Sequence, residues 1–286
     1  MQQVLKYITA NGLQFAYYEV GSGPLILLLH GFPDTPQTWS EVQPQLAASG
    51  YRVAAPFMRG YSPTQAPTDG DYSVLNLGYD VLDLIQALGE SNAIVIGHDW
   101  GAFAAYAAAN IDSQRIRKLV TIAIPHPGTL QFNVKTLFKS SHFIKFQFRK
   151  WAVAQLERND FAEIEAIYRR WSPTWEVTPA DLVPIKQALA APGGIQNALG
   201  YYWSFVQDAF GPRSVEVRHL VQARTSVPTL SFFGELDGAL DNQNIERTRK
   251  YFTGGYELVR IPEAGHFVHR EMPKVFIEKT LEFIGQ

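Results

Sequence analysis

Residues 94–102 of the chain read Ile94-Val95-Ile96-Gly97-His98-Asp99-Trp100-Gly101-Ala102. An apolar run typical of a buried strand leads into a polar residue between two glycines, and an alanine-rich helical segment follows. Gly97 and Gly101 permit a turn sharp enough to expose the side chain of Asp99. The stretch therefore predicts a strand, a tight turn and a helix, with a carboxylate at the tip of the turn. The alternative is an ordinary turn in which Asp99 only caps the helix.

Short apolar strands and helices alternate on both sides of this stretch, which is typical of a parallel sheet covered by helices on both faces. We therefore expect the α/β fold class. The strands expected before residue 126 are Val4–Ile8, Leu13–Val20, Leu25–Leu29, Tyr51–Ala55, Ala93–Ile96 and Leu119–Ile124. The helices expected there are Trp39–Ser49, Val74–Leu88 and Phe103–Ala109.

The pattern changes between residues 126 and 221, where aromatic residues lie at helical spacing and no convincing strand occurs. After Pro228 the alternation returns, so the sequence predicts a core of residues 1–125 and 222–286, interrupted by a helical cap over residues 126–221. The elements expected after the cap are Thr229–Phe233, a helix near Asn244–Phe252, Tyr256–Ile261 and a last helix around Lys274–Ile284.

Composition excludes several classes of function. The chain has 25 basic and 27 acidic residues, a net charge of −2, so it has no field to attract nucleic acid or an anionic membrane. The expected partner is a small, weakly charged molecule. With no cysteine, the chain offers no disulfide, no cysteine-ligated zinc and no thiol nucleophile.

The longest purely aliphatic run, Leu25–Leu29, is far shorter than the roughly 18 residues of a spanning helix. The first residues also lack the apolar segment of a secretory signal. We therefore expect a soluble, cytoplasmic protein. The oligomeric state stays open, and a homodimer is compatible with the sequence.

A carboxylate attacks amides poorly but opens an electrophilic sp³ carbon, which leaves an alkyl ester on the enzyme. Hydrolysis of that ester needs a base and an acid that orients the base. His266 and Asp237 each follow a predicted strand, at the sheet edge where α/β proteins place their sites. His266 is the expected base and Asp237 its acid, with Glu235 and Asp241 as competitors for the acid.

Four motifs resemble the epoxide hydrolases of the α/β-hydrolase fold, and the order Asp99, Asp237, His266 is that of this fold. Haloalkane and haloacetate dehalogenases are close relatives that use the same aspartate. The resemblance implies a helical cap, no cofactor and no metal. The motifs are His30-Gly31-Phe32-Pro33, Arg59-Gly60-Tyr61-Ser62, Gly97-His98-Asp99-Trp100-Gly101 and Gly265-His266.

The resemblance also implies two cap side chains that support the oxygen of an opening epoxide ring. Tyr202 stands at the position of one of them, and His142 stands where the other is usually tyrosine. Tyr201, one residue before Tyr202, is expected to bind the substrate. The main-chain N–H groups at Phe32 and Trp100 are the expected oxyanion donors. His30 and His98 are interpreted as structural.

The leading hypothesis is an epoxide hydrolase acting on a small apolar epoxide and water. The alternative is a dehalogenase, in which the Trp100 indole would hold the halide. Phe32 weakens this alternative, because haloalkane dehalogenases often carry an asparagine there. Haloacetate dehalogenases carry an arginine at the position of Trp100, so this residue also weakens the dehalogenase alternative. A ligand receptor without turnover and an esterase are the weaker alternatives.

Overall fold

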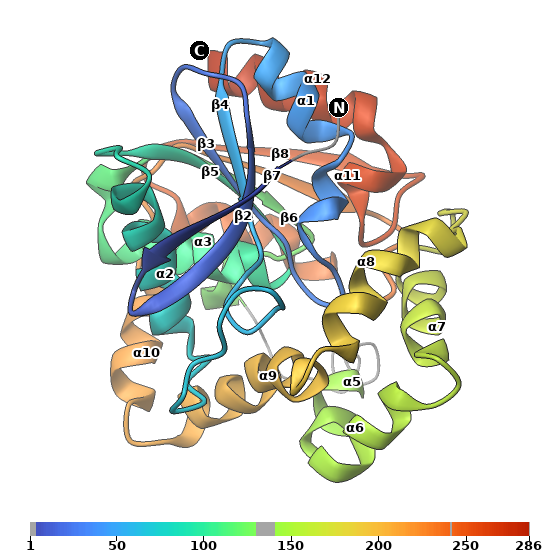
Figure 1. The fold of residues 1–286 in the computed structure, drawn as a ribbon. Coiled ribbons are helices and arrows are strands. Elements are labelled where there is room, and N and C mark those ends of the chain that lie inside the picture. Colours follow the sequence, from blue (N-terminus) through green and yellow to red (C-terminus); the bar gives the residue numbers. More distant parts are fainter. Residues whose placement is uncertain (1–3, 130–140, 241, 286) are drawn as a thin grey trace.

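The computed structural model describes residues 4–129, 141–240 and 242–285. Within these residues an eight-stranded sheet runs through the centre of the molecule in the order β1-β2-β4-β3-β5-β6-β7-β8 (Figure 1). Only the β1–β2 and β2–β4 pairs are antiparallel. The strands are β1 (Leu5–Ala10), β2 (Leu13–Val20), β3 (Leu25–Leu29), β4 (Arg52–Pro56), β5 (Ala93–His98), β6 (Ile116–Ile122), β7 (Thr229–Gly234) and β8 (Tyr256–Ile261).

Helices cover both faces of the sheet because successive strand residues point to opposite sides. Leu25, Leu27 and Leu29 of β3 pack on the side of helices α2 (Val74–Ala87) and α3 (Trp100–Ile111). Ile26 and Leu28 pack on the other side, with α1 (Val42–Ala48) and α12 (Pro273–Gly285). Figure 1 shows α1 and α12 side by side, away from α2 and α3. The predicted α/β fold class, a mostly parallel sheet with helices on both faces, is confirmed.

Helices occupy the described part of the segment between β6 and β7. In Figure 1, α5 to α9 lie together below and to the right of the sheet, and we call them the cap helices. Residues 130–140 of the predicted cap lie outside the described residues, and the boundaries 126 and 221 stay a prediction. The helices are α5 (Ser141–Gln147), α6 (Arg149–Glu157), α7 (Ala162–Trp171), α8 (Pro179–Ala190), α9 (Gly194–Phe210) and α10 (Ser214–Gln222).

Three expected helices differ from those observed. The helix expected at Trp39–Ser49 is a 3-10 turn, Pro36–Trp39, followed by α1. Pro44 is tolerated in the first turn of α1, where a main-chain N–H has no helical partner. The helix α3 begins earlier than expected, directly after Asp99, and the segment Asn242–Tyr251 is 3-10 instead of α-helical.

Among the described helices, none combines the length and the apolar character that crossing a membrane requires.

Candidate active site

Asp99 occupies the turn between β5 and α3, with φ 51° and ψ −119°, a conformation that non-glycine residues rarely adopt. The neighbouring glycines serve close packing instead of positive φ. A Cβ on Gly97 would lie 2.3 Å from the carbonyl oxygen of Gly101, and one on Gly101 would lie 2.3 Å from that of Leu29. A Cβ on Gly31 would lie 2.4 Å from the Cβ of Asp99. The strained turn is therefore held by backbone segments that only glycine lets meet.

The structure brings Asp99, His266 and Asp237 together at the carboxyl ends of β5, β8 and β7. The Oδ2 atom of Asp99 lies 3.5 Å from Nε2 of His266, and Nδ1 of His266 lies 2.9 Å from Oδ2 of Asp237. The other Asp237 oxygen accepts the main-chain N–H groups of Ala239, at 2.7 Å, and Leu240, at 3.2 Å. Both carboxylates thus face one imidazole.

The competing acids are not equivalent to Asp237. Glu235 is exposed and forms an ion pair with Arg260, 3.0 Å away at the surface. Asp241 lies outside the described residues. Among the described acids of this loop, Asp237 is therefore the one that contacts the imidazole of His266.

The oxyanion donors that the sequence predicts lie beside Asp99. The main-chain N–H of Phe32 donates to Oδ1 of Asp99 at 2.8 Å. Trp100 is the first residue of α3, where the main-chain N–H has no acceptor within the helix. One Asp99 oxygen is thus held by a main-chain donor, and the other faces His266.

The charges of the site are set by competition between burial and ion pairing. Burial acts to raise the pKa of Asp99, but the His266 imidazole and the Phe32 N–H outweigh it, so the pKa is lowered and the group is ionised at neutral pH. Burial acts to lower the pKa of His266, but Asp237 and Asp99 outweigh it and raise the pKa to about 10. In the resting site an imidazolium therefore lies between two carboxylates.

We expect Asp99→Asn to lower the pKa of His266, because the substitution removes one of the two carboxylates that stabilise the imidazolium. The ¹⁵N chemical shifts of the His266 ring, followed from neutral to alkaline pH, measure this change. In the wild type the proton is lost at higher pH than in the variant. An identical titration in both proteins would contradict the conclusion that the Asp99 carboxylate raises the pKa of His266.

Tyr202, on α9, is buried against the turn between β5 and α3 that carries Asp99, which we call the elbow. Its ring meets those of Trp100, at 5.1 Å between centroids, and Phe32, at 5.3 Å, edge to face. Burial, followed by the nearby Asp99 carboxylate, raises the pKa of the Tyr202 hydroxyl well above its usual value, so the hydroxyl keeps its proton. The indole Nε1 of Trp100 approaches this hydroxyl but reaches no hydrogen-bond partner among the described residues.

His142, on α5, lies in the same aromatic cluster. Its ring centroid lies 5.7 Å from that of Tyr202 and 4.8 Å from that of Trp171, and Trp171 in turn contacts His266 at 5.0 Å. Burial lowers the pKa of His142 to about 3. The imidazole is therefore neutral at pH 7 and carries one N–H that can donate.

Tyr201 points away from Asp99, unlike its neighbour Tyr202. Its hydroxyl donates to the carbonyl oxygen of Arg59 at 2.8 Å, and its ring packs 5.6 Å from that of Trp100. The hydroxyl is thus engaged in joining α9 to the core. The substrate-binding role that we predicted for Tyr201 has no support in this arrangement, because adjacent residues of a helix face different directions.

His30 and His98 lie as expected of structural residues. His30 accepts the main-chain N–H of Met58 at Nε2, 3.0 Å away, and its Nδ1 lies 3.0 Å from the carbonyl oxygen of Gly31. Because Nε2 accepts, Nδ1 must carry the proton and donate it to this carbonyl oxygen. The Nε2 of His98 lies 3.1 Å from the carbonyl oxygen of His266.

Sequence reasoning missed two features of the site. The carbonyl oxygen of Trp171 accepts the main-chain N–H groups of both Gly238 and His266, at 3.1 and 3.0 Å. No sequence pattern marks such a main-chain contact. The hydroxyl of Tyr61 is buried without a hydrogen-bond partner among the described residues, and its proximity to Tyr202 and Asp99 adds to burial in raising its pKa well above the usual value. Its position in the Arg59-Gly60-Tyr61-Ser62 motif was the available signal.

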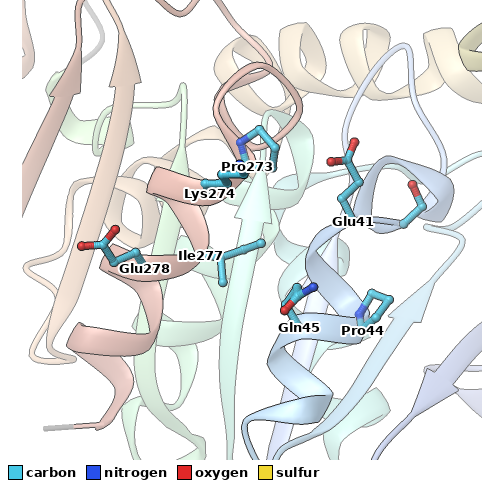
Figure 2. Close-up of a pocket in the computed structure, with 8 residues that line it drawn as sticks. Glu41, Pro44, Gln45, Pro273, Lys274, Ile277 and Glu278 are labelled. Carbon is cyan, nitrogen blue, oxygen red and sulfur yellow. The ribbon is translucent and has the colours of Figure 1, made fainter.

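A separate groove of about 610 Å³ lies between α1 and α12 (Figure 2). Glu41, Pro44 and Gln45 line one side, and Pro273, Lys274, Ile277 and Glu278 the other. None of the predicted site residues belongs to it. Within the described ranges, no group of three His, Asp or Glu side chains is placed to hold a metal ion.

The strained turn after a central strand, with an acid and a base from two later strands, defines a hydrolase of the α/β type. Residues 24–273 match the family model described as alpha/beta hydrolase fold, and the chain belongs to this family.

Several proteins resemble the chain over nearly its whole length. It is 29% identical to human "Epoxide hydrolase 4" over 98% of this chain and 78% of that protein. It is 26% identical to "Epoxide hydrolase A" of Mycobacterium tuberculosis, over 98% of this chain and 96% of that one. It is also 29% identical to "AB hydrolase superfamily protein YfhM" of Bacillus subtilis, over 98% and 97%.

Solved structures agree on the fold. Epoxide Hydrolase A from Mycobacterium thermoresistibile superposes with a TM-score of 0.86 at 24% identity, over 99% of this chain and 98% of that one. An epoxide hydrolase from Vigna radiata gives 0.85 at 23% identity, over 99% and 98%. The resemblance to the epoxide hydrolases that the motifs indicate is confirmed, and the protein is a hydrolase.

Proposed function

We propose that the protein is an epoxide hydrolase that converts an apolar epoxide into a vicinal diol through an ester on Asp99. The observation that carries the proposal is the position of the Asp99 carboxylate, between the Phe32 N–H at 2.8 Å and the His266 imidazole at 3.5 Å, in a site that also holds the Tyr202 hydroxyl. Similarity to named epoxide hydrolases supports the same reaction.

In the first half-reaction, Oδ2 of Asp99 attacks one ring carbon and forms a C–O ester bond, while the bond from that carbon to the ring oxygen breaks. The electron pair goes to the ring oxygen, which takes the proton of the Tyr202 hydroxyl. The neutral His142 is the proposed second donor to this oxygen. Oδ1 stays on the Phe32 N–H and becomes the carbonyl oxygen of the ester.

Esterification removes the charge of Asp99 and with it one of the two groups that raise the pKa of His266. The proton that His266 now holds more weakly passes to solvent, and the neutral imidazole becomes the base of the second half-reaction; His266 takes a proton back from solvent once Asp99 is ionised again. His266 takes a proton from water, whose oxygen attacks the ester carbonyl carbon, and the Phe32 N–H stabilises the oxyanion at Oδ1. The acyl–oxygen bond then breaks, and His266 returns its proton to the departing oxygen. The second proton of the water, now on the Asp99 carboxyl group, passes to the Tyr202 phenolate and restores the hydroxyl.

The walls around Asp99 favour an apolar substrate. The rings of Phe32, Trp100, Tyr202 and Trp171 are buried, and they make edge-to-face or tilted contacts with one another and with the cap residues Phe143 and Phe146. Such walls exclude strongly hydrated groups and suit an aryl or alkyl epoxide.

We expect Tyr202→Phe to lower the rate of ring opening by about 100-fold, because the opening oxygen loses the donor that supplies its proton and keeps only the proposed hydrogen bond from His142. Tyr201→Phe is the matched control on the same helix, since its hydroxyl donates to Arg59 and not into the site. Single-turnover mixing with styrene oxide measures the rate. Equal losses in both variants would show that the Tyr202 hydroxyl acts only through packing.

A dehalogenase is the second candidate, favoured by the Trp100 indole N–H, which is buried and has no hydrogen-bond partner among the described residues. Turnover of epoxides and of halogenated substrates separates the two. The enzyme is incubated with styrene oxide, epoxyhexane, chlorobutane and chloroacetate, and diol and free halide are quantified. The proposal predicts diol from the epoxides and no halide. Halide release without diol formation would replace it with the dehalogenase.

A further inference from the structure

Glu271, five residues beyond His266, ends the short helix α11 (Val268–Glu271). Its carboxylate accepts four hydrogen bonds, two at each oxygen. The donors at Oε1 are the Ser172 hydroxyl at 2.6 Å and the Phe267 main-chain N–H at 3.1 Å. The donors at Oε2 are the Thr174 hydroxyl at 2.7 Å and the Gly265 main-chain N–H at 2.9 Å.

These donors come from two segments that matter to the site. Gly265 and Phe267 are the residues on either side of His266, so Glu271 binds the main chain both before and after the base. Ser172 and Thr174 directly follow cap helix α7. The carboxylate therefore joins the His266 loop to the chain that leaves the cap.

Two further contacts make this junction tight. The main-chain N–H of His266 donates to the Trp171 carbonyl oxygen at 3.0 Å, and the Phe267 N–H is shared with the Ser172 hydroxyl at 3.1 Å. Gly265 fits against this segment because it has no side chain: a Cβ there would lie 2.6 Å from Cα of Ser172.

We propose that Glu271 is a positioning residue for the base. It fixes the loop 265–267 against residues 171–174, and thereby sets the direction of the His266 ring toward Asp99 and the attacking water. The inference rests on the proposed function, because the step that Glu271 serves is hydrolysis of the Asp99 ester. Attack by Asp99 itself does not depend on this alignment, since the Phe32 N–H and the elbow hold the carboxylate.

The chemistry of a carboxylate explains why glutamate is required. Each oxygen receives one main-chain N–H, and a main-chain N–H cannot reverse its role. Glutamine offers one oxygen and one NH₂ group, so one of the two main-chain amides beside His266 would face a donor and lose its hydrogen bond to residue 271. Glu271→Gln should therefore have a smaller effect than Glu271→Ala, which removes all four bonds.

The experiment separates the two half-reactions. Wild type, Glu271→Gln and Glu271→Ala are mixed rapidly with styrene oxide and quenched, and mass spectrometry follows the ester-bearing protein over time. We expect Glu271→Ala to slow ester hydrolysis by about 100-fold, the size of effect that misalignment by about 1 Å produces. The rate of ester formation should stay that of the wild type, and Glu271→Gln should fall between.

Glu19→Gln is the control for general loss of stability, because Glu19 is a partly buried glutamate on β2 that pairs with Lys6 and Arg52. It should leave both half-reactions unchanged. Equal slowing of both half-reactions in Glu271→Ala, or unchanged hydrolysis in both Glu271 variants, would overturn the positioning role. His266→Gln is run in parallel: if it forms no ester, the proposed function fails and this inference with it.

Discussion

Asp99→Asn is expected to lower diol formation by about 10⁴-fold or more, the scale of loss that follows removal of a catalytic nucleophile. The amide is uncharged and cannot displace the ring oxygen of an epoxide. Asparagine is preferred to alanine as the replacement because residue 99 has φ 51°, a region that asparagine enters more readily than alanine. The Phe32 N–H can still donate to the amide oxygen, so the turn keeps its shape.

Steady-state diol formation from styrene oxide measures this loss, and an intact-mass check verifies that the variant carries the amide. Asp112→Asn is the matched control, because Asp112 lies at the opposite end of helix α3 and its side chain accepts the Gln114 N–H, away from the site. Turnover in the control should equal that of the wild type. Residual activity of Asp99→Asn within tenfold of wild type would remove Asp99 from its role as nucleophile.

His266→Gln is expected to reduce steady-state turnover by about 10³- to 10⁴-fold, the share of catalysis that a general base supplies. The loss should fall on ester hydrolysis. Glutamine cannot accept a proton from water, whereas Asp99 keeps its carboxylate, its Phe32 N–H and the nearby Tyr202 hydroxyl. The variant should therefore consume one equivalent of epoxide per active site and release no diol.

His219→Gln controls for histidine replacement in general, since His219 is exposed on α10. It should turn over epoxide at the wild-type rate. Consumption of many equivalents of epoxide by His266→Gln would mean that another group activates the water, and the assignment of the base would be wrong.

The fold was predictable because its signals are local. Apolar runs such as Leu25–Leu29 are buried on both faces of the sheet, and the glycines around Asp99 mark the elbow. The glycines that follow the last two predicted strands indicated that Asp237 and His266 would lie at the carboxyl ends of the strands, where Asp99 also lies. The roles of these residues and of Tyr202 and His142 stay predictions until the variants are measured.

Other features depend on contacts between distant segments. Tyr201 and Tyr202 are adjacent and chemically alike, and only the docking of α9 decides that one hydroxyl meets Arg59 while the other faces Trp100. Glu271 has no motif that marks it, because its four donors come from two segments almost a hundred residues apart. The 3-10 form of Asn242–Tyr251 likewise escaped prediction from spacing.

The most direct test of the central claim is the intact mass of His266→Gln after exposure to styrene oxide and, separately, to chloroacetate. Without its base the protein should accumulate an adduct whose mass equals that of the whole epoxide, and peptide mapping should place the adduct on Asp99. Ring opening by addition gives this mass, because no atom leaves. An adduct formed only with chloroacetate, lighter than the reagent by hydrogen chloride, would contradict the account and identify a dehalogenase.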